Sequence, residues 1–259
     1  MPLLIIPIGV AGSGKSTAAS YIRDLAIQQG LTASEAAFAA PIKAFCHDLF
    51  RFTESAVYGS SQDREEEFDI YCDLWTWEAA RVWLALSADE FVSECWPNAT
   101  PDFWLRARKA LDVWFDDLMA ECTWEWVMTE QGRRLRRQRG LSARRALQTL
   151  GTEWGRELDA DVWINCLKRN VEASADDVVV LSDARFFNEA EKSGGFPLLI
   201  RRPDANARTP THASEKDQQT PEMLQFCLNN GAVVDNTGSL VDLHHRLRQV
   251  LEKALAVVG

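Results

Sequence analysis

Apolar residues in this chain form short continuous runs, and segments with helical periodicity lie between them. Residues 3–8 (LLIIPI) and 177–183 (DVVVLSD) are the clearest runs, and such runs are typical of strands buried on both faces of a parallel sheet. Between Lys15 and Gln29 apolar residues recur every three or four positions, which predicts an amphipathic helix ending at Gly30. Strands that alternate with helices predict an α/β fold with helices on both faces of a parallel sheet.

The same patterns place the other elements of this sheet and its helices. We expect further strands near 34–39, 197–201 and 232–236, and helices near 42–50, 142–158, 159–171, 187–193 and 239–256. Residues 202–220 are polar and contain proline, which predicts a loop. Residues 202–217 of this loop could close over bound substrate as a lid and exclude water.

Residues 60–131 differ from the rest and predict a helical, Trp-rich insertion between core segments 1–59 and 132–259. Eight of the ten Trp lie between Trp75 and Trp126, interleaved with acidic residues. We expect most of them to form the core of the insertion, while one or two could instead stack on a nucleotide base. Two helical faces are predicted, Trp75–Trp83–Leu86 and Phe103–Ala107–Leu111–Trp114–Leu118.

The net charge of −10 comes entirely from the same middle region. Residues 63–125 hold 16 Asp and Glu against 5 Lys and Arg. A general nucleic-acid-binding surface needs clustered positive charge, so nucleic acid is not an expected partner. No apolar stretch approaches the ~20 residues that cross a bilayer, and the N-terminal run lacks the basic flank of a signal peptide.

The cysteines favour a reducing compartment. Six are spread along the chain, without paired spacing and without a histidine at ligand spacing, which argues against a disulfide framework or a zinc site. We therefore expect mostly buried, reduced thiols in a cytoplasmic protein.

The strongest chemical signal is the glycine-rich segment GVAGSGKS at residues 9–16, which fits the phosphate-loop pattern G-x-x-x-x-G-K-[ST]. Backbone N–H groups of such a loop surround phosphate oxygens, and the following helix adds positive potential. Lys15 would reach the β- and γ-phosphates, and the Ser16 hydroxyl would ligate Mg²⁺. The predicted nucleotide-binding residues are Gly9, Gly12, Ser13, Gly14, Lys15, Ser16 and Thr17. The fold class is thus a three-layer P-loop fold.

A second strand supplies a candidate metal ligand. Asp183 follows the apolar run at 177–181, at the sheet edge where a carboxylate can hold Mg²⁺. The alternative is a helix cap or a turn residue, although Arg185, Asn188 and Glu189 lie within about one turn of it.

Arginine is the dominant cation, and seven arginines fall in residues 133–145. They could form a solvated helical face that docks against the acidic insertion. Alternatively, those nearest the QTLGT turn could recognise phosphate, for which Arg has bidentate geometry. Arg201, Arg202 and Arg208 flank or occupy the predicted lid, and Arg201 is a candidate catalytic cation.

Four stretches together resemble the bacteriophage-type deoxynucleoside monophosphate kinases, a branch of the P-loop nucleoside monophosphate kinases. They are GVAGSGKST (9–17), FAAPIKAF (38–45), LQTLGTEWGRELDADVWI (147–164) and VVLSDARFFNEAE (179–191), with weaker support from residues 212–215 and 233–243. In the second stretch, Ala40 stands where the family phrase carries an acid.

The resemblance implies transfer of the ATP γ-phosphoryl group to a deoxynucleoside 5′-monophosphate, with Mg²⁺. Lys15, Asp183, Arg185 and Arg201 would be catalytic, and Ser16 and Asp183 would hold the metal. Lys43, Gln148, Thr152, Arg156 and Arg185 would contact the acceptor, on the side of the insertion. A homodimer is possible. The alternatives are another small-molecule kinase, similar to phosphomevalonate kinase, and a viral assembly ATPase.

Overall fold

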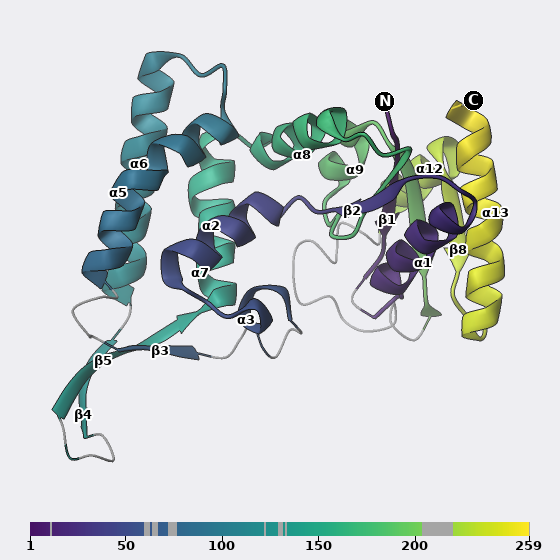
Figure 1. Cartoon of the computed structure of the whole chain (residues 1–259). Helices are drawn as coiled ribbons and strands as arrows, with labels where there is room; N and C mark the ends of the chain where they lie inside the picture. The colour runs from purple at the N-terminus through teal and green to yellow at the C-terminus, as the bar shows by residue number, and fades with distance from the viewer. Residues whose placement is uncertain are drawn as a thin grey trace. The chain divides into compact units, whose positions relative to one another are not determined.

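The computed structural model describes residues 1–10, 12–59, 63, 67–71, 77–121, 123–128, 132, 134–203 and 220–258. These residues fall into two compact units (Figure 1). Met1–Phe38 and Ile164–Gly259 make up the first unit, and Ala39–Trp163 the second. The second unit therefore extends on both sides of residues 60–131, the range that the sequence suggested for an insertion.

The first unit is built on a five-stranded parallel sheet, which confirms the predicted α/β class. Its strands run in the order β2-β6-β1-β7-β8. Their bounds are β1 Leu3–Ile8, β2 Ala33–Ala36, β6 Val178–Leu181, β7 Phe196–Arg201 and β8 Ala232–Asp235. The central strand β1 is buried at all six positions, and so is the neighbouring β6 at all four, because each lies between two other strands. The two clearest apolar runs in the sequence are thus the central strand β1 and its neighbour β6.

Helices α1 (Lys15–Gln28) and α13 (Leu240–Val258) pack together on one face of this sheet (Figure 1). Alternate strand residues such as Ile5, Val180 and Leu198 enter the core with them, as expected when side chains alternate between the two faces. Helix α12 (Pro221–Asn230) packs on β7 and β8. The remaining helices of this unit are α8 (Val162–Ala173), which begins two residues before the unit boundary, and α9 (Phe187–Ser193).

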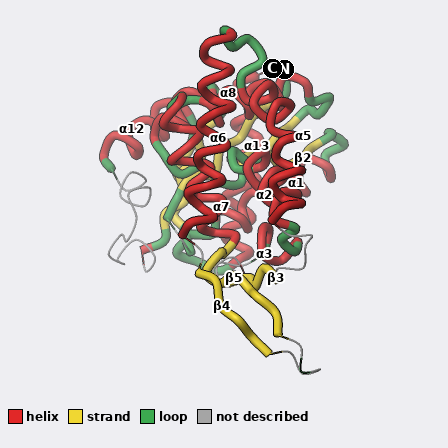
Figure 2. The backbone as a smooth tube through the Cα atoms, turned by 90° about the vertical axis from the view of Figure 1, so that its left-hand side faces the viewer, coloured by secondary structure: helices red, strands yellow, loops and turns green. Residues whose placement is uncertain are grey.

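The second unit combines helices with a small antiparallel sheet in the order β3-β5-β4. Figure 2 shows these strands in yellow below the helices. The helices are α2 (Ala40–Phe50), α3 (Glu54–Tyr58), α5 (Trp77–Cys95), α6 (Pro101–Glu121), α7 (Ala143–Thr149) and the π-helix η1 (Leu150–Arg156). The strands are β3 (Glu67–Tyr71), β4 (Thr123–Met128) and β5 (Arg134–Ser142).

The strands of this small sheet correct two expectations. Residues 63–130 are not helical throughout, because β3 and β4 lie inside this range, and most of the arginine-rich run is strand β5 and not a helical face. Thr123–Met128 reads TWEWVM, whose alternation has the period of a strand. The register sets Glu125 opposite Arg137. Helical periodicity elsewhere in the insertion concealed this pattern.

Of the eight tryptophans predicted to form the core of the insertion, the structure describes the side chains of four: Trp114 is buried, and Trp83, Trp96 and Trp104 are half-buried. Trp114, Trp154 and Trp163 are buried, and the Trp154 ring lies 5.2 Å from Trp96 and 5.3 Å from Phe91, centroid to centroid. The predicted face from Phe103 to Leu118 is confirmed, because Ala107, Leu111, Trp114 and Leu118 are all buried. Leu86 is 78% exposed, so its assignment to an interior face was wrong, and Trp75 lies outside the described residues.

Cys46, Cys95, Cys166 and Cys227 are buried free thiols, and Cys72 and Cys122 lie outside the described residues. Burial raises the pKa of the Cys227 thiol to about 12, which keeps it protonated and unreactive at neutral pH. None of the described helices has the length and apolar character needed to cross a membrane.

Candidate active site

The glycine-rich loop connects the central strand β1 to helix α1, which is the context that the phosphate-loop pattern requires. Ser13 donates its backbone N–H to the Val10 carbonyl at 3.1 Å, and Ala18 closes the first helical turn on the Gly14 carbonyl at 2.9 Å. Lys15 Nζ donates to the Gly9 carbonyl, so the ammonium group lies over the start of the loop. Gly12, Ser16 and Thr17 are exposed, whereas Ser13 is completely buried. Ala11 lies outside the described residues.

The N-terminus of α1 is well suited to bind an anion. Gly14 is the N-cap, no side chain caps the helix, and its first turn contains no acidic residue. The first N–H groups of a helix have no acceptor within the helix, and the helix dipole makes this end positive. An anionic phosphate would satisfy both.

Asp183 lies two residues beyond strand β6, which pairs directly with β1. The carboxyl ends of parallel neighbours meet at one edge of the sheet, so Asp183 and the phosphate loop leave the sheet at the same edge. One Asp183 carboxylate oxygen accepts the backbone N–H of Phe38 at 2.8 Å. Ser16 and Asp183 would offer only oxygen ligands, the kind that Mg²⁺ prefers beside substrate phosphate.

The turn after Asp183 is held by Glu189. One oxygen of this carboxylate accepts the backbone N–H groups of Arg185 at 2.7 Å and of Phe186 at 2.9 Å. Glu189 is only 3% exposed, and it completes the capping box of α9. These contacts show that the Glu189 carboxylate fixes the turn. Arg185 itself is exposed.

Arg201, the last residue of β7, is paired with Asp235, the last residue of β8. Arg201 Nε lies 2.8 Å and Nη2 lies 2.7 Å from Asp235 Oδ1, with both side chains less than half exposed. The pair joins the ends of two neighbouring strands. Arg202 is exposed, while Arg208 and residues 204–217 of the predicted lid lie outside the described residues.

Asn236 is a residue of this region to which the sequence assigned no role. Its side-chain amide donates to the Ser13 carbonyl at 2.9 Å, across 223 positions of the sequence. The available signal was its position directly after a short apolar strand, within VVDNTGS.

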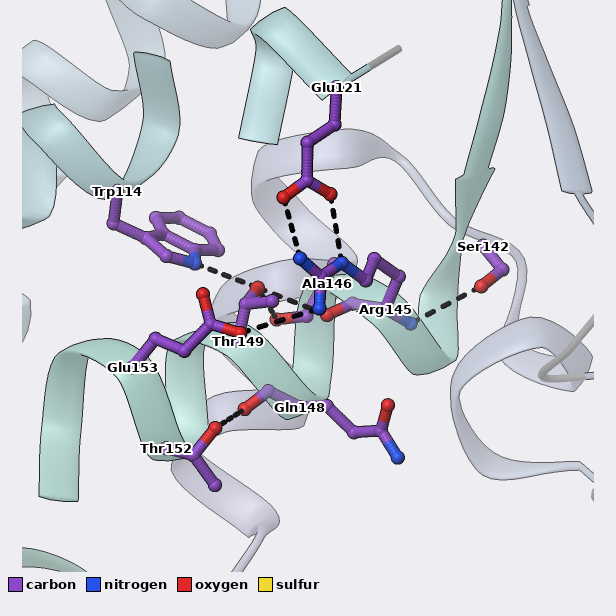
Figure 3. A network of polar contacts seen from close by, with 9 residues as sticks. All are labelled: Trp114, Glu121, Ser142, Arg145, Ala146, Gln148, Thr149, Thr152 and Glu153. Atoms are coloured by element: carbon purple, nitrogen blue, oxygen red, sulfur yellow. Dashed lines mark hydrogen bonds and ion pairs between the residues drawn. The ribbon is translucent and has the colours of Figure 1, made fainter. Parts of the chain in front are cut away.

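Three of the predicted acceptor residues lie on one helical segment of the second unit. Gln148, Thr152 and Arg156 are four positions apart, and residues at this spacing share a helix face. The Thr152 hydroxyl donates to the Gln148 carbonyl at 2.6 Å, and Figure 3 shows the Gln148 side chain extending away from the other polar contacts drawn. Gln148 and Thr152 are exposed, and Arg156 is half-buried. π-Helical turns are rare and often occur at functional sites.

The opposite side of the same segment is occupied by structural contacts. Figure 3 shows Arg145 bound through two nitrogens to Glu121, at 2.6 and 2.9 Å, and reaching Glu153 at 3.3 Å. These hydrogen bonds lower the pKa of the Glu121 carboxyl. Glu121 belongs to the acidic residues 63–125. Of the two roles considered for the arginines, Arg145 therefore fits contact with this acidic segment better than phosphate recognition.

Lys43, another predicted acceptor contact, lies on α2. Its ammonium nitrogen is 5.2 Å from the centroid of the Tyr58 ring, which is within the range of a cation–π interaction. Lys43 is half-buried.

Two viral proteins are similar to this chain over most of its length. One is a protein of Acanthamoeba polyphaga mimivirus named as a deoxynucleotide monophosphate kinase, 25% identical over 237 residues, which cover 90% of this chain and 91% of that protein. The other is the deoxynucleoside-5′-monophosphate kinase of Escherichia phage T5, 28% identical over 215 residues, which cover 74% and 71%. No family model matches the chain. The resemblance carried by the motifs is confirmed by these two similarities.

Proposed function

We propose that this chain, which resembles the phage-type deoxynucleoside monophosphate kinases, transfers the γ-phosphoryl group of ATP to the phosphate of a deoxynucleoside 5′-monophosphate. The bond between the γ-phosphorus and the β,γ-bridging oxygen breaks, and a bond from an acceptor phosphate oxygen to that phosphorus forms. The products are ADP and the deoxynucleoside diphosphate. The observation that carries the proposal is the phosphate loop and Asp183 following two adjacent strands of one sheet.

The donor side of the reaction is assigned to the first unit. The uncapped N-terminus of α1 and the loop N–H groups would bind the ATP phosphates. Lys15, whose ammonium lies over the loop, would neutralise charge that develops between the β- and γ-phosphates. Ser16 and Asp183 would hold Mg²⁺, which supplies further charge neutralisation when bound.

The acceptor side is assigned to Lys43, Gln148, Thr152 and Arg156 of the second unit. Arg185, in the first unit, is proposed separately as a phosphate-binding cation. An acceptor monophosphate carries nearly two negative charges, so fixed cations are needed to bring it toward an anionic donor. Arg156 lies in the stretch 147–164 and Arg185 in the stretch 179–191, two of those that carry the family resemblance, and Arg offers two parallel N–H donors to phosphate. No general base is required, because the acceptor oxygen is already anionic near neutrality.

Acceptor-dependent release of ADP tests the proposal. Purified protein with MgATP is assayed against dAMP, dGMP, dCMP and dTMP, with the ribonucleotides beside them, and products are identified by chromatography. We expect diphosphate formation with at least one deoxynucleotide, and its loss in Lys15→Ala. The matched control is Lys253→Ala, because Lys253 Nζ also donates to a glycine carbonyl, that of Gly231 at 2.7 Å, at another place in the same unit.

Three outcomes would contradict the proposal. Slow ATP hydrolysis that no monophosphate accelerates would indicate an assembly-type ATPase. Transfer to phosphomevalonate, but to no nucleotide, would indicate a different small-molecule kinase. Equal loss of activity in Lys253→Ala and Lys15→Ala would show that the lysine effect comes from folding.

A further inference from the structure

Asn236 joins the end of the last strand to the phosphate loop. Its backbone N–H donates to the Arg201 carbonyl at 2.6 Å, and its side-chain Nδ2 donates to the Ser13 carbonyl at 2.9 Å. One residue therefore contacts both the end of β7 and the loop. It is half-buried, and its amide lies against the loop backbone.

The hydrogen bond to Ser13 sets the orientation of one peptide group. A trans peptide is planar, and its C=O and N–H point in opposite directions. Because Asn236 holds the Ser13 carbonyl, the N–H of Gly14 in the same peptide is directed away from Asn236. In this loop pattern such N–H groups are the donors to phosphate.

The conformation of Gly14 shows why this peptide needs an anchor. Its φ of 104° lies in the region that side chains disfavour, and a Cβ at this position would lie 2.8 Å from Asn236 Nδ2. The amide of Asn236 thus packs directly on the glycine. Glycine is free to adopt several other conformations in the absence of such a contact.

Asn236 is itself firmly supported. The preceding residue, Asp235, pairs through its carboxylate with Arg201 at 2.8 Å, and its carbonyl accepts a hydrogen bond from Arg246 of α13 at 2.6 Å. The Arg201–Asp235 ion pair therefore has a structural consequence: it fixes the strand end from which Asn236 reaches the loop. A group that orients others must itself be held in place.

We propose that Asn236 is a positioning residue of the donor site, which orients the Ser13–Gly14 peptide so that the Gly14 N–H is directed at the phosphates of ATP. The inference rests on the proposed function, because it assigns the loop to ATP. Asn236 acts through the loop backbone.

The test is Asn236→Ala, assayed by calorimetry with MgATP and by steady-state kinetics. We expect the Kd and KM for ATP to rise on the order of tenfold, since one charge-assisted hydrogen bond loses its alignment. The KM for the acceptor should stay within about twofold of the wild-type value, because the amide orients only the donor loop. A residue with a purely structural role would lower the melting temperature without this selective change.

Asn230→Ala is the matched control. The Asn230 amide also donates to a backbone carbonyl at 2.9 Å, that of Phe226 in α12, so both variants lose a hydrogen bond of the same kind in the same unit. We expect Asn230→Ala to bind ATP as the wild type does. If Asn236→Ala does not fold, Asn236→Leu carries the test, since it keeps the approximate size and branching of the side chain and removes the Nδ2 donor without adding a charge beside the loop.

The possible results separate this inference from the proposed function. A wild type that neither binds MgATP nor transfers phosphate refutes the proposed function and the inference with it. A wild type active as a kinase, with unchanged ATP affinity in a folded Asn236 variant, refutes the inference alone. An equal increase in KM for ATP and for the acceptor also refutes it.

Discussion

Phe38 donates its backbone N–H to the Asp183 carboxylate over 2.8 Å, and this hydrogen bond joins the segment that follows β2 to the segment that follows β6. The two residues are 145 positions apart in the sequence. The contact shows that Asp183 has a structural task besides any role in holding metal. An amide oxygen accepts the same hydrogen bond as a carboxylate oxygen, so an asparagine at position 183 can separate the two tasks.

We predict that Asp183→Asn lowers kcat by at least ~100-fold, the usual scale for an electrostatic group of an active site. Its melting temperature should remain close to that of the wild type, because the asparagine oxygen can still accept the Phe38 N–H. Kinetics across a Mg²⁺ titration, with thermal unfolding alongside, measure both effects. Unchanged kcat and Mg²⁺ dependence would leave Asp183 with the structural task alone.

Replacement of Arg156 by Ala should weaken the acceptor selectively. Loss of charge-assisted hydrogen bonds to the monophosphate should lower kcat/KM for the acceptor by ~10- to 1000-fold, while ATP affinity barely changes. Arg145→Ala is the control, since Arg145 lies on the same helical segment but pairs with Glu121 and Glu153. The control should affect stability more than acceptor kinetics. Matching kinetic losses in the two variants would argue against an acceptor role for Arg156.

Gly155→Ala should destabilise the second unit. A Cβ at this position would lie 2.3 Å from Cζ2 of Trp163, whose indole nitrogen donates to the Gly151 carbonyl at 2.9 Å. Overpacking of this kind costs about 1–3 kcal/mol, measurable by urea unfolding. In the double variant Gly155→Ala/Trp163→Phe the smaller ring should relieve part of the clash. Its loss of unfolding free energy should therefore be smaller than the sum of the losses in the two single variants. If the two losses simply add, the destabilisation by Gly155→Ala does not come from a clash with Trp163.

The pH dependence of stability should include a contribution from Asp177. Hydrogen bonds from the Thr32 backbone N–H, at 2.8 Å, and from its hydroxyl, at 2.9 Å, lower the pKa of the Asp177 carboxyl from its ordinary value of 3.8. The unfolded chain therefore binds this proton more readily, so the stabilisation is present above pH 3.8 and disappears as the pH falls through the lowered value.

Asp177→Asn removes that contribution. The wild type should be more stable than the variant at pH 7, and the difference should shrink as the pH falls below 3.8. Urea midpoints measured from pH 7 to pH 2 provide the comparison. A difference that stays constant over this range would mean that the carboxylate gains nothing from Thr32.

Local sequence was enough to predict the strand and the helix on either side of the glycine-rich loop. Several elements are each encoded by one continuous run of residues, and the local pattern of that run predicts their structure. They are strand β1, the loop, helix α1 and strand β6. The position of Asp183 just beyond a strand was predictable for the same reason, because it follows an apolar run. The role of Glu189 was also predictable, since its partners at Arg185 and Phe186 are only four and three positions away.

The second unit was predicted less well, because its contacts depend on residues far apart in the chain. Most of the arginine-rich run forms strand β5, which pairs with β3 on one side and β4 on the other. The sequence of the run itself does not indicate either partner. The packing of η1 likewise involves a residue outside it: Trp163 donates to the Gly151 carbonyl and leaves no room for a side chain at Gly155.

The sequence by itself determined that a phosphate-loop pattern follows one apolar strand and a carboxylate follows another, since each lies directly beside its strand in a continuous run of residues. Only the tertiary structure decided how that chemistry is held. The hydrogen bonds from Phe38 to Asp183 and from Asn236 to Ser13 span 145 and 223 positions. They form because parallel strands distant in sequence end at one edge of a sheet, a juxtaposition that no local pattern encodes.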